Sequence, residues 1–414
     1  MKRHFFVFVS SILLIANFCA AEEFPAFDLP DGFAGTAFVD KIKEDSLVTV
    51  STKAELKSAL RKGGLIYVNG MIDLSEGMLP EEGGLSTPAL DAFVKKNSKF
   101  STYQEYRDAY AAACKVGTED TSKGPHSSLY DTMHSLNSAY GDIIRLSVKS
   151  NTALIGVGPN SGFSGGSVSV NGVSNVIIKN LNILDAYDPF PHHEENDGYN
   201  AQHDTVSVQD AKNVWIDHCT LADTKSLSHV LTSGMFDEKY QTYDGLCDIT
   251  KNSNNVTVSY CKFMNHSKTM LIGSSDSEQI KASSRKVTLH HNYFYNCASR
   301  LPMVRLSTIH AYNNYFEADS SAFYANSYCL GVRYNSLINA ENNYYGSGIK
   351  NSFAGNSKKF GTVYSAGEID KSANGKKSGE FKTSDKPLFE VPYKYELLAA
   401  EKVPEFVKAN AGTK

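Results

Sequence analysis

A nine-residue pattern of alternating apolar and polar positions recurs through the second half of the chain. Its copies begin at Asn175, Asn213, Asn255, Lys286 and Thr308, with a weaker copy at Leu337. Most copies have an apolar residue at the second and fourth positions and a bulky apolar or aromatic residue at the ninth. Such alternation is typical of a β-strand with one buried face.

The spacing of these copies indicates how the strands are arranged. Successive copies begin 38, 42, 31, 22 and 29 residues apart. A repeat with a minimum length that tolerates insertions is typical of a solenoid, in which each repeat stacks on its neighbour. Because every copy resembles a strand and none has a helical period, the pattern predicts an all-β fold, a parallel β-helix whose insertions are loops.

The first residues have the features of a secretory signal peptide, which we predict to span residues 1–21. Lys2 and Arg3 precede an apolar stretch from Phe5 to Phe18, and small residues precede Glu22. The apolar stretch is shorter than the roughly 20 residues that a membrane span requires. We therefore expect an exported protein that does not insert into a membrane.

Residues 22–414 are predicted to form a single β-helix domain. The helix-like segment TKAELKSALRKG and the strand-like segment LIYVNGMIDL suit a cap that covers the first coil. Residues 75–145 are polar and rich in Tyr and Ser, and we interpret them as an insertion with a helix near Thr102 to Lys115. From residue 353 to 414 the repeat fades, which predicts an irregular C-terminal tail along the outside.

Composition narrows the possible partners. The chain has 41 Lys and Arg against 45 Asp and Glu, and loss of the signal peptide removes two basic residues. It therefore lacks the basic surface that nucleic-acid binding requires.

Cys219 and Cys261 share the seventh position of successive copies and are expected to stack; whether they form a disulfide stays open. We expect the chain to act as a monomer.

Several charged residues lie at similar distances before the start of a copy, that is, at a similar phase of the repeat. Asp204 lies 9 residues before one copy, and Asp244 and Asp248 lie 11 and 7 residues before the next. Equal phase implies neighbouring coils about 4.8 Å apart. Three carboxylates this close repel one another unless a cation lies between them, and an all-oxygen ligand set favours Ca²⁺. The alternative is a row of solvated surface aspartates.

Basic residues follow in the same part of the repeat. Asp276 lies 10 residues before one copy and Arg300 lies 8 residues before the next, within the same narrow range, and Pro302 separates Arg300 from Arg305. A bend at the proline would direct both guanidinium groups into one groove, which Lys268 could also reach from its loop. Together with a calcium site, these cations imply a polyanionic ligand that carries carboxylates. Taken singly, each could be an ordinary surface charge.

Four segments together resemble a known family. VWIDHCT at 214–220, DGLCD at 244–248, SKTMLIGSSDS at 267–277 and LHHNYFYNCASRLPMVR at 289–305 resemble the extracellular pectate lyases of polysaccharide lyase family 1. The resemblance covers residues 150–346. It implies a right-handed parallel β-helix that is secreted and cleaves α-1,4-polygalacturonate by β-elimination with Ca²⁺ as cofactor.

The resemblance also implies roles for individual residues. Asp204, Asp244 and Asp248 match the calcium ligands, and Arg300 matches the base that removes the C5 proton. Lys268 and Arg305 match the residues that bind the substrate carboxylates. Gln202 stands where some family members have a further aspartate, so a fourth carboxylate ligand is not expected.

The sequence also offers candidate saccharide contacts and leaves alternative functions open. Tyr187, Phe190 and Tyr199 are the aromatic residues that we expect to contact a saccharide. The alternatives to a pectate lyase are a calcium-independent pectin lyase and a β-helix that binds acidic polysaccharide without cleaving it. A hydrolase would use paired carboxylates and yield a product without a double bond.

Overall fold

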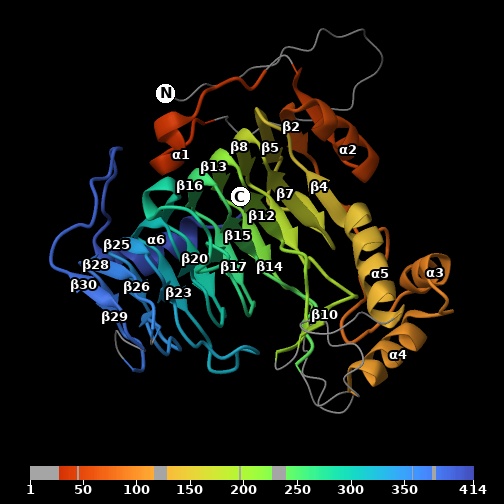
Figure 1. Cartoon of the computed structure of the whole chain (residues 1–414). Helices are drawn as coiled ribbons and strands as arrows, with labels where there is room; N and C mark the ends of the chain where they lie inside the picture. The colour runs from red at the N-terminus through yellow and green to blue at the C-terminus, as the bar shows by residue number, and fades with distance from the viewer. Residues whose placement is uncertain are drawn as a thin grey trace, which may run out of the picture.

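The computed structural model describes residues 28–43, 46–115, 128–194, 197–225, 239–356, 358–374 and 379–414. The predicted signal peptide lies outside these residues. Three parallel β-sheets run along the molecule, and Figure 1 shows their strands stacked from one end to the other. The chain passes through one strand of each sheet in turn and then moves to the next coil.

An 11-stranded sheet forms the longest face. Its strands, in spatial order, are β1 (Val48–Val50), β2 (Gly64–Val68), β5 (Thr152–Gly156), β8 (Ser174–Lys179), β13 (Lys212–Asp217), β16 (Asn254–Ser259), β19 (Lys286–His290), β22 (Thr308–Tyr312), β25 (Leu337–Glu341), β28 (Thr362–Ala366) and β30 (Lys382–Ser384).

A 9-stranded sheet and an 8-stranded sheet form the other two faces. The 9-stranded sheet consists of β3 (Met71–Asp73), β6 (Gly162–Ser164), β9 (Asn182–Leu184), β14 (Thr220–Ala222), β17 (Lys262–Met264), β20 (Tyr293–Tyr295), β23 (Tyr315–Glu317), β26 (Tyr344–Tyr345) and β29 (Ile369–Asp370). The 8-stranded sheet consists of β4 (Arg145–Ser147), β7 (Ser167–Asn171), β12 (Val206–Gln209), β15 (Cys247–Thr250), β18 (Leu271–Ile272), β21 (Met303–Val304), β24 (Leu330–Val332) and β27 (Phe353–Ala354).

This arrangement confirms the predicted parallel β-helix, and it refines the repeat. Each nine-residue copy is two short strands joined by a bend, as in β8 and β9. The sixth position lies at the bend and has a left-handed backbone in every copy. The residues there are Asn180, His218, Tyr260, His291, Asn313 and Asn342. Asparagine tolerates this conformation better than most residues, which explains its frequency there.

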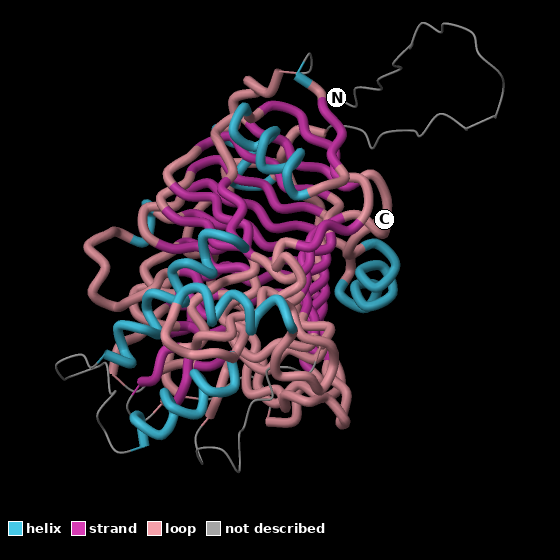
Figure 2. Tube along the Cα trace, turned by 90° about the vertical axis from the view of Figure 1, so that its right-hand side faces the viewer, coloured by secondary structure: helices cyan, strands magenta, loops and turns pink. Residues whose placement is uncertain are grey.

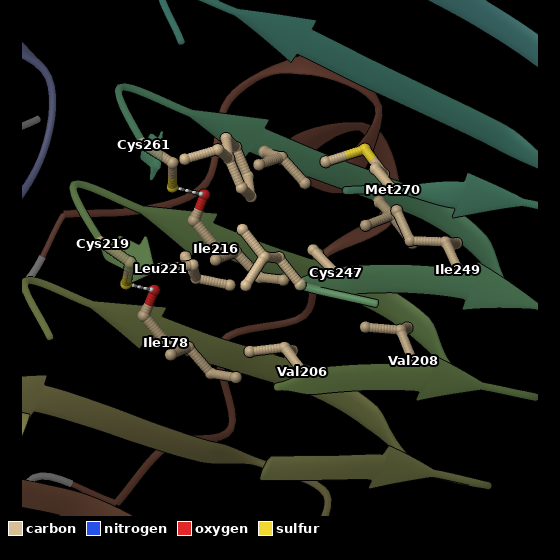
Figure 3. Packing of buried hydrophobic residues seen from close by; sticks show 14 of the residues in the cluster. Ile178, Val206, Val208, Ile216, Cys219, Leu221, Cys247, Ile249, Cys261 and Met270 are labelled. Carbon is tan, nitrogen blue, oxygen red and sulfur yellow. Dashed lines mark hydrogen bonds between the residues drawn. The ribbon is translucent and has the colours of Figure 1, made fainter. Parts of the chain in front are cut away.

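The core lies inside the coils, where equivalent positions stack. Figure 3 shows Ile178 and Ile216 pointing inward from adjacent coils. At the ninth position Phe263, Phe294 and Phe316 stack with ring centroids 4.9 Å apart. The Cys219 and Cys261 thiols are buried and form no disulfide, and they donate to the carbonyl oxygens of Ile178 and Ile216 at 3.5 and 3.6 Å.

In the coils that follow the two cysteines, the seventh position is occupied by a buried column of asparagines. Asn292 donates from Nδ2 to Oδ1 of Asn314 at 2.9 Å, and Asn314 donates in the same way to Asn343 at 2.9 Å. Asn314 also donates to the carbonyl oxygen of Leu289 and accepts from the backbone N–H of Asn292. The column therefore satisfies polar groups at a bend that is closed to water.

Helices cover the ends and outer faces. The predicted cap is α2 (Lys53–Lys62), which begins with a capping box between Thr52 and Glu55 and adds Leu56 and Leu60 to the core. Helix α1 (Gly32–Ala37) packs on the outer face of the 11-stranded sheet, and α6 (Val403–Asn410) packs against Tyr293 and Tyr315. Across the described residues, no helix has the length and apolar character needed to cross a membrane.

The region 75–145 contains three helices, α3 (Pro88–Asn97), α4 (Tyr103–Lys115) and α5 (Ser128–Ile144), of which the sequence predicted only α4. They form a second hydrophobic core beside the coils. Figures 1 and 2 show the three helices grouped together against the coils. Beyond Phe353, strands β27 to β29 add a further coil and β30 extends the 11-stranded sheet, so the repeat continues past the predicted start of the irregular tail. Buried Phe353 and Val363 preserve the inward pattern although the segment is rich in Lys, Gly and Ser.

We expect Asn314→Ala to lower the free energy of unfolding by roughly 2–4 kcal/mol, because it leaves several buried polar groups without partners. Asn252→Ala, at an exposed loop position, is the matched control and should cost less than about 1 kcal/mol. Urea titration followed by circular dichroism measures both. Equal effects of the two substitutions would show that the asparagine column does not stabilise the coils.

Candidate functional site

A groove of about 1130 Å³ lies along the outer face of the 8-stranded sheet. Its lining includes Asp244, Lys268, Arg300 and Arg305, four of the six residues that the sequence singled out for chemistry. The loops that lead from the 9-stranded sheet into the 8-stranded sheet form its walls, so residues from successive coils meet in one place.

The aspartates lie at one edge of this groove. Asp204 accepts a hydrogen bond from the backbone N–H of Gly245 at 3.1 Å, and Asp248 accepts one from the backbone N–H of Leu271 at 2.9 Å. In the β12–β15 register Asp248 stands beside Ser207, not beside Asp204. The two carboxylates therefore approach each other across Gly245, from different positions of adjacent coils.

Gly245 keeps the space between these carboxylates open. A Cβ atom at this position would lie 2.4 Å from Oδ1 of Asp248 and 3.0 Å from Oδ1 of Asp204. Both distances are too short for a side chain to be added without displacing the carboxylates. The glycine is therefore required by the close approach of the two aspartates.

Burial and mutual repulsion shift the ionisation of this cluster. Burial, followed by the charges of Asp248 and Asp244, raises the pKa of Asp204 well above its usual range. Burial and the charge of Asp244 raise the pKa of Asp248 to about 7, against the opposing effects of the Leu271 N–H, Arg300 and Lys268. Carboxylates that resist ionisation for this reason gain most from a neighbouring cation.

The cluster therefore suits a hard cation in its chemistry, with oxygen donors and an open space at Gly245. Asp244 is turned toward Lys268, and its Oδ1 lies 2.8 Å from the Lys268 Nζ. Within the part of the chain that the structure describes, no three His, Cys, Asp or Glu side chains form a ready ligand set for one ion. An ion held by all three aspartates would therefore share the Asp244 carboxylate with Lys268 or displace the lysine from it.

The basic residues occupy the next coils. Lys268 aligns with Gly245 on one side and with Ser299 on the other, which brings Arg300 one residue farther along the same wall. Arg300 has a left-handed backbone with φ of 60°, an uncommon conformation for a residue with a side chain. Such strain is often found where a side chain must be directed to a specific point.

Arg305 is held by two neighbours. Its Nε lies 3.1 Å from Oδ1 of Asp276, and Nη1 donates to the carbonyl oxygen of Gly273 at 3.4 Å. Burial lowers the pKa of Arg305, Asp276 opposes this shift, and the nearby charges of Arg300 and Arg333 add to it. Asp276, which shares the phase of the cluster in the sequence, therefore lies apart from the other aspartates and orients Arg305.

A buried pair beneath the cluster was not found from the sequence. His266 Nδ1 lies 2.8 Å from Oδ2 of Asp223, and His266 Nε2 lies 2.5 Å from the carbonyl oxygen of Asp244. A carbonyl oxygen only accepts, so Nε2 carries the proton and donates. The pair thus fixes the backbone of Asp244. Asp223 and His266 are 43 residues apart, one more than the 42 between the copies at Asn213 and Asn255, so the phase of the repeat could have indicated the pair.

The predicted saccharide contacts at Tyr187, Phe190 and Tyr199 are wrong. All three side chains are buried in the second core, with Phe190 completely inaccessible. Three other aromatic residues line the groove at the coil that follows Arg300, namely Phe323, Tyr324 and Tyr328. The loop that contains them follows β23 and has no repeat pattern, which explains why the sequence did not single it out.

The family model and two relatives that match this sequence carry the same description. The sequence model of the family described as pectate lyase matches residues 132–414, more than half of the chain. Pectate lyase E of Dickeya chrysanthemi is 38% identical over 253 residues, 60% of this chain and 64% of that protein, so the match spans less than two thirds of this relative. A pectate lyase of Bacillus subtilis is 31% identical over 321 residues, 75% of this chain and 72% of that protein.

Solved structures of pectate lyases share the fold. A thermostable pectate lyase superposes with a TM-score of 0.73 at 28% identity, covering 92% of this chain and 96% of that one. A pectate lyase bound to a hexasaccharide superposes with a TM-score of 0.76 at 25% identity and the same coverage.

Proposed function

The chain belongs to the pectate lyase family, and from this premise we propose that it cleaves α-1,4-linked polygalacturonate by β-elimination. The observation that supports this most is the groove that combines Lys268, Arg300 and Arg305 with an adjacent carboxylate cluster. Such a surface suits a polymer that carries one carboxylate on every unit. A structural relative bound to a hexasaccharide is consistent with a groove of this length.

In the proposed reaction Arg300 accepts the proton from C5 of a galacturonate unit. The electron pair left at C5 forms a double bond to C4, and the bond between C4 and the glycosidic oxygen breaks. The polymer on the far side of that bond departs with the glycosidic oxygen, which takes a proton from water. The new chain end is an unsaturated uronate, which a hydrolase would not produce.

Lys268 and Arg305 bind the substrate carboxylate and stabilise the charge that develops as C5 loses its proton. A proton next to a carboxylate is too weakly acidic to be removed unless positive groups are already in position. Asp276 holds Arg305 in place for this task through its 3.1 Å contact with Nε. Because a free guanidinium retains its proton near neutral pH, we expect the reaction to be favoured in alkaline solution.

We further propose that Asp204, Asp244 and Asp248 hold a calcium ion. The ion would supply positive charge beside the substrate carboxylate. The residues support this by their oxygen donors, by the raised pKa values of Asp204 and Asp248, and by the space that Gly245 leaves between them. The predicted signal peptide at residues 1–21 supports export of the protein, which we propose to act as a secreted monomer.

We expect Arg300→Lys to reduce turnover of polygalacturonate by roughly 10²–10⁴-fold, because a lysine cannot receive the proton from the same point. Ultraviolet absorbance of the unsaturated product measures the rate. Arg61→Lys, on the exposed side of α2, is the matched control and should leave the rate unchanged. Retained activity in Arg300→Lys would remove Arg300 from the role of base, and new reducing ends without the absorbance band would mean hydrolysis.

Gly245→Ala is expected to weaken calcium binding by about tenfold or more, because the added methyl group fills the space between the carboxylates. Isothermal titration calorimetry with calcium chloride measures the affinity without substrate. Gly172→Ala is the control, because its side chain would enter open space, although its left-handed backbone strains it. The metal assignment is contradicted by an unchanged calcium affinity in Gly245→Ala, or by turnover that survives a chelator.

A further inference from the structure

A second hollow of about 470 Å³ continues from the edge of the groove over strands β4, β7 and β12. Gln202 lines both the groove and this second hollow, and Asp204 lines the second hollow from its inner end. The two spaces therefore meet at the carboxylate cluster. None of the residues farther along the second hollow has a role in the proposed reaction.

The floor of the second hollow is a ladder of hydroxyl and amide groups. Ser147 pairs with Ser169, Ser169 with Ser207, and Ser207 with Asp248, one residue from each of four adjacent coils. Asn171 and Gln209 form a parallel column two residues farther along each strand. These groups both donate and accept hydrogen bonds, as sugar hydroxyls require.

One wall carries a cation. Arg145 is the first residue of β4, directly after α5, and its side chain is 43% exposed. Its ion-pair partner Asp142 lies 3.8 Å away with a side chain that is 80% exposed, so this contact is weak. The guanidinium group can therefore turn to a carboxylate of a ligand and bind it with two hydrogen bonds.

A buried histidine completes the wall. His203 is 7% exposed and lines the second hollow, and its Nε2 has no hydrogen-bond partner among the described residues. A Cβ atom at Gly141 of α5 would lie 2.9 Å from Cε1 of His203 and 3.0 Å from Nη2 of Arg145. Helix α5 thus brings both side chains together, and a buried nitrogen without a partner is a group that a ligand can satisfy.

We propose that the second hollow binds a further uronate unit of the same polymer, beyond the calcium site. Arg145 takes the carboxylate of this unit, and the Ser, Asn and Gln ladder takes its hydroxyls. The inference rests on the proposed function and adds how the protein distinguishes long chains from short ones. From β4 to β24 the two spaces extend over six steps between coils, about 29 Å at 4.8 Å per step, a length that only an oligomer occupies.

The proposal predicts a dependence on chain length. In Arg145→Gln the ratio of kcat/KM for hexagalacturonate to that for trigalacturonate should fall about tenfold, through KM, because a charged hydrogen bond is lost only with the longer chain. Lys212→Gln removes the same charge from an exposed site on the 11-stranded sheet and should leave the ratio unchanged. Equal losses on both substrates, or no loss on either, would overturn the proposal.

Direct binding separates this proposal from the proposed function. Isothermal titration calorimetry with hexagalacturonate should show weaker binding to Arg145→Gln than to the unaltered protein, whether or not either eliminates the substrate. Titration with inorganic phosphate tests the other occupant. If phosphate binding depends on Arg145 while hexagalacturonate binding does not, the second hollow is a site for a small anion and the proposal fails.

Discussion

The stacking of one coil on the next in fixed register is the constraint on which the rest of the structure depends. Backbone hydrogen bonds between coils bring equivalent residues to a separation of about 4.8 Å along three faces. Side chains at one position of the repeat therefore form a column along the molecule. The column is stable only if identical or similar side chains can pack against one another. Aromatic rings satisfy this by stacking, as Phe263, Phe294 and Phe316 do, and asparagines satisfy it by bonding to one another.

The same constraint destabilises columns of like charges, because the charges repel one another at this separation. The candidate site nevertheless contains several carboxylates close together. On the outer face of the 8-stranded sheet a column of serines ends at Asp248, and Asp204 approaches it from an adjacent position. The register that stabilises the core fixes the backbone positions that carry these carboxylates, and both lie close to Gly245. Burial and then this repulsion raise their pKa values, and a bound cation relieves the repulsion.

The columns also determine how much could be predicted from the sequence. Inward positions must be apolar in every coil, so the sequence contains a repeat from which the fold could be predicted. The positions of Asp204, Asp244 and Asp248 relative to that repeat predicted that they lie at one edge. The pairing of individual residues between coils could not be predicted, because the insertions before each copy differ in length. In the structure Asp248 lies beside Ser207. The contact between His266 and Asp223 was not predicted, although the two residues follow the paired strands β14 and β17 at nearly the same phase of the repeat.

The helical insertion accounts for the remaining failure and gives the groove its individual character. Tyr187 and Tyr199 follow a repeat strand and were expected to face a saccharide, but α3 to α5 supply a second core that buries them. The same core holds the hairpin of β10 (His192–Glu194) and β11 (Gly198–Asn200), which contributes Glu194 and Asn200 to one wall of the groove. Because α5 runs directly into β4, the packing of this helix also determines where Arg145 lies. The coils thus provide a repeating floor, and the insertion determines where the groove wall at β10 and β11 and the Arg145 side chain lie along it.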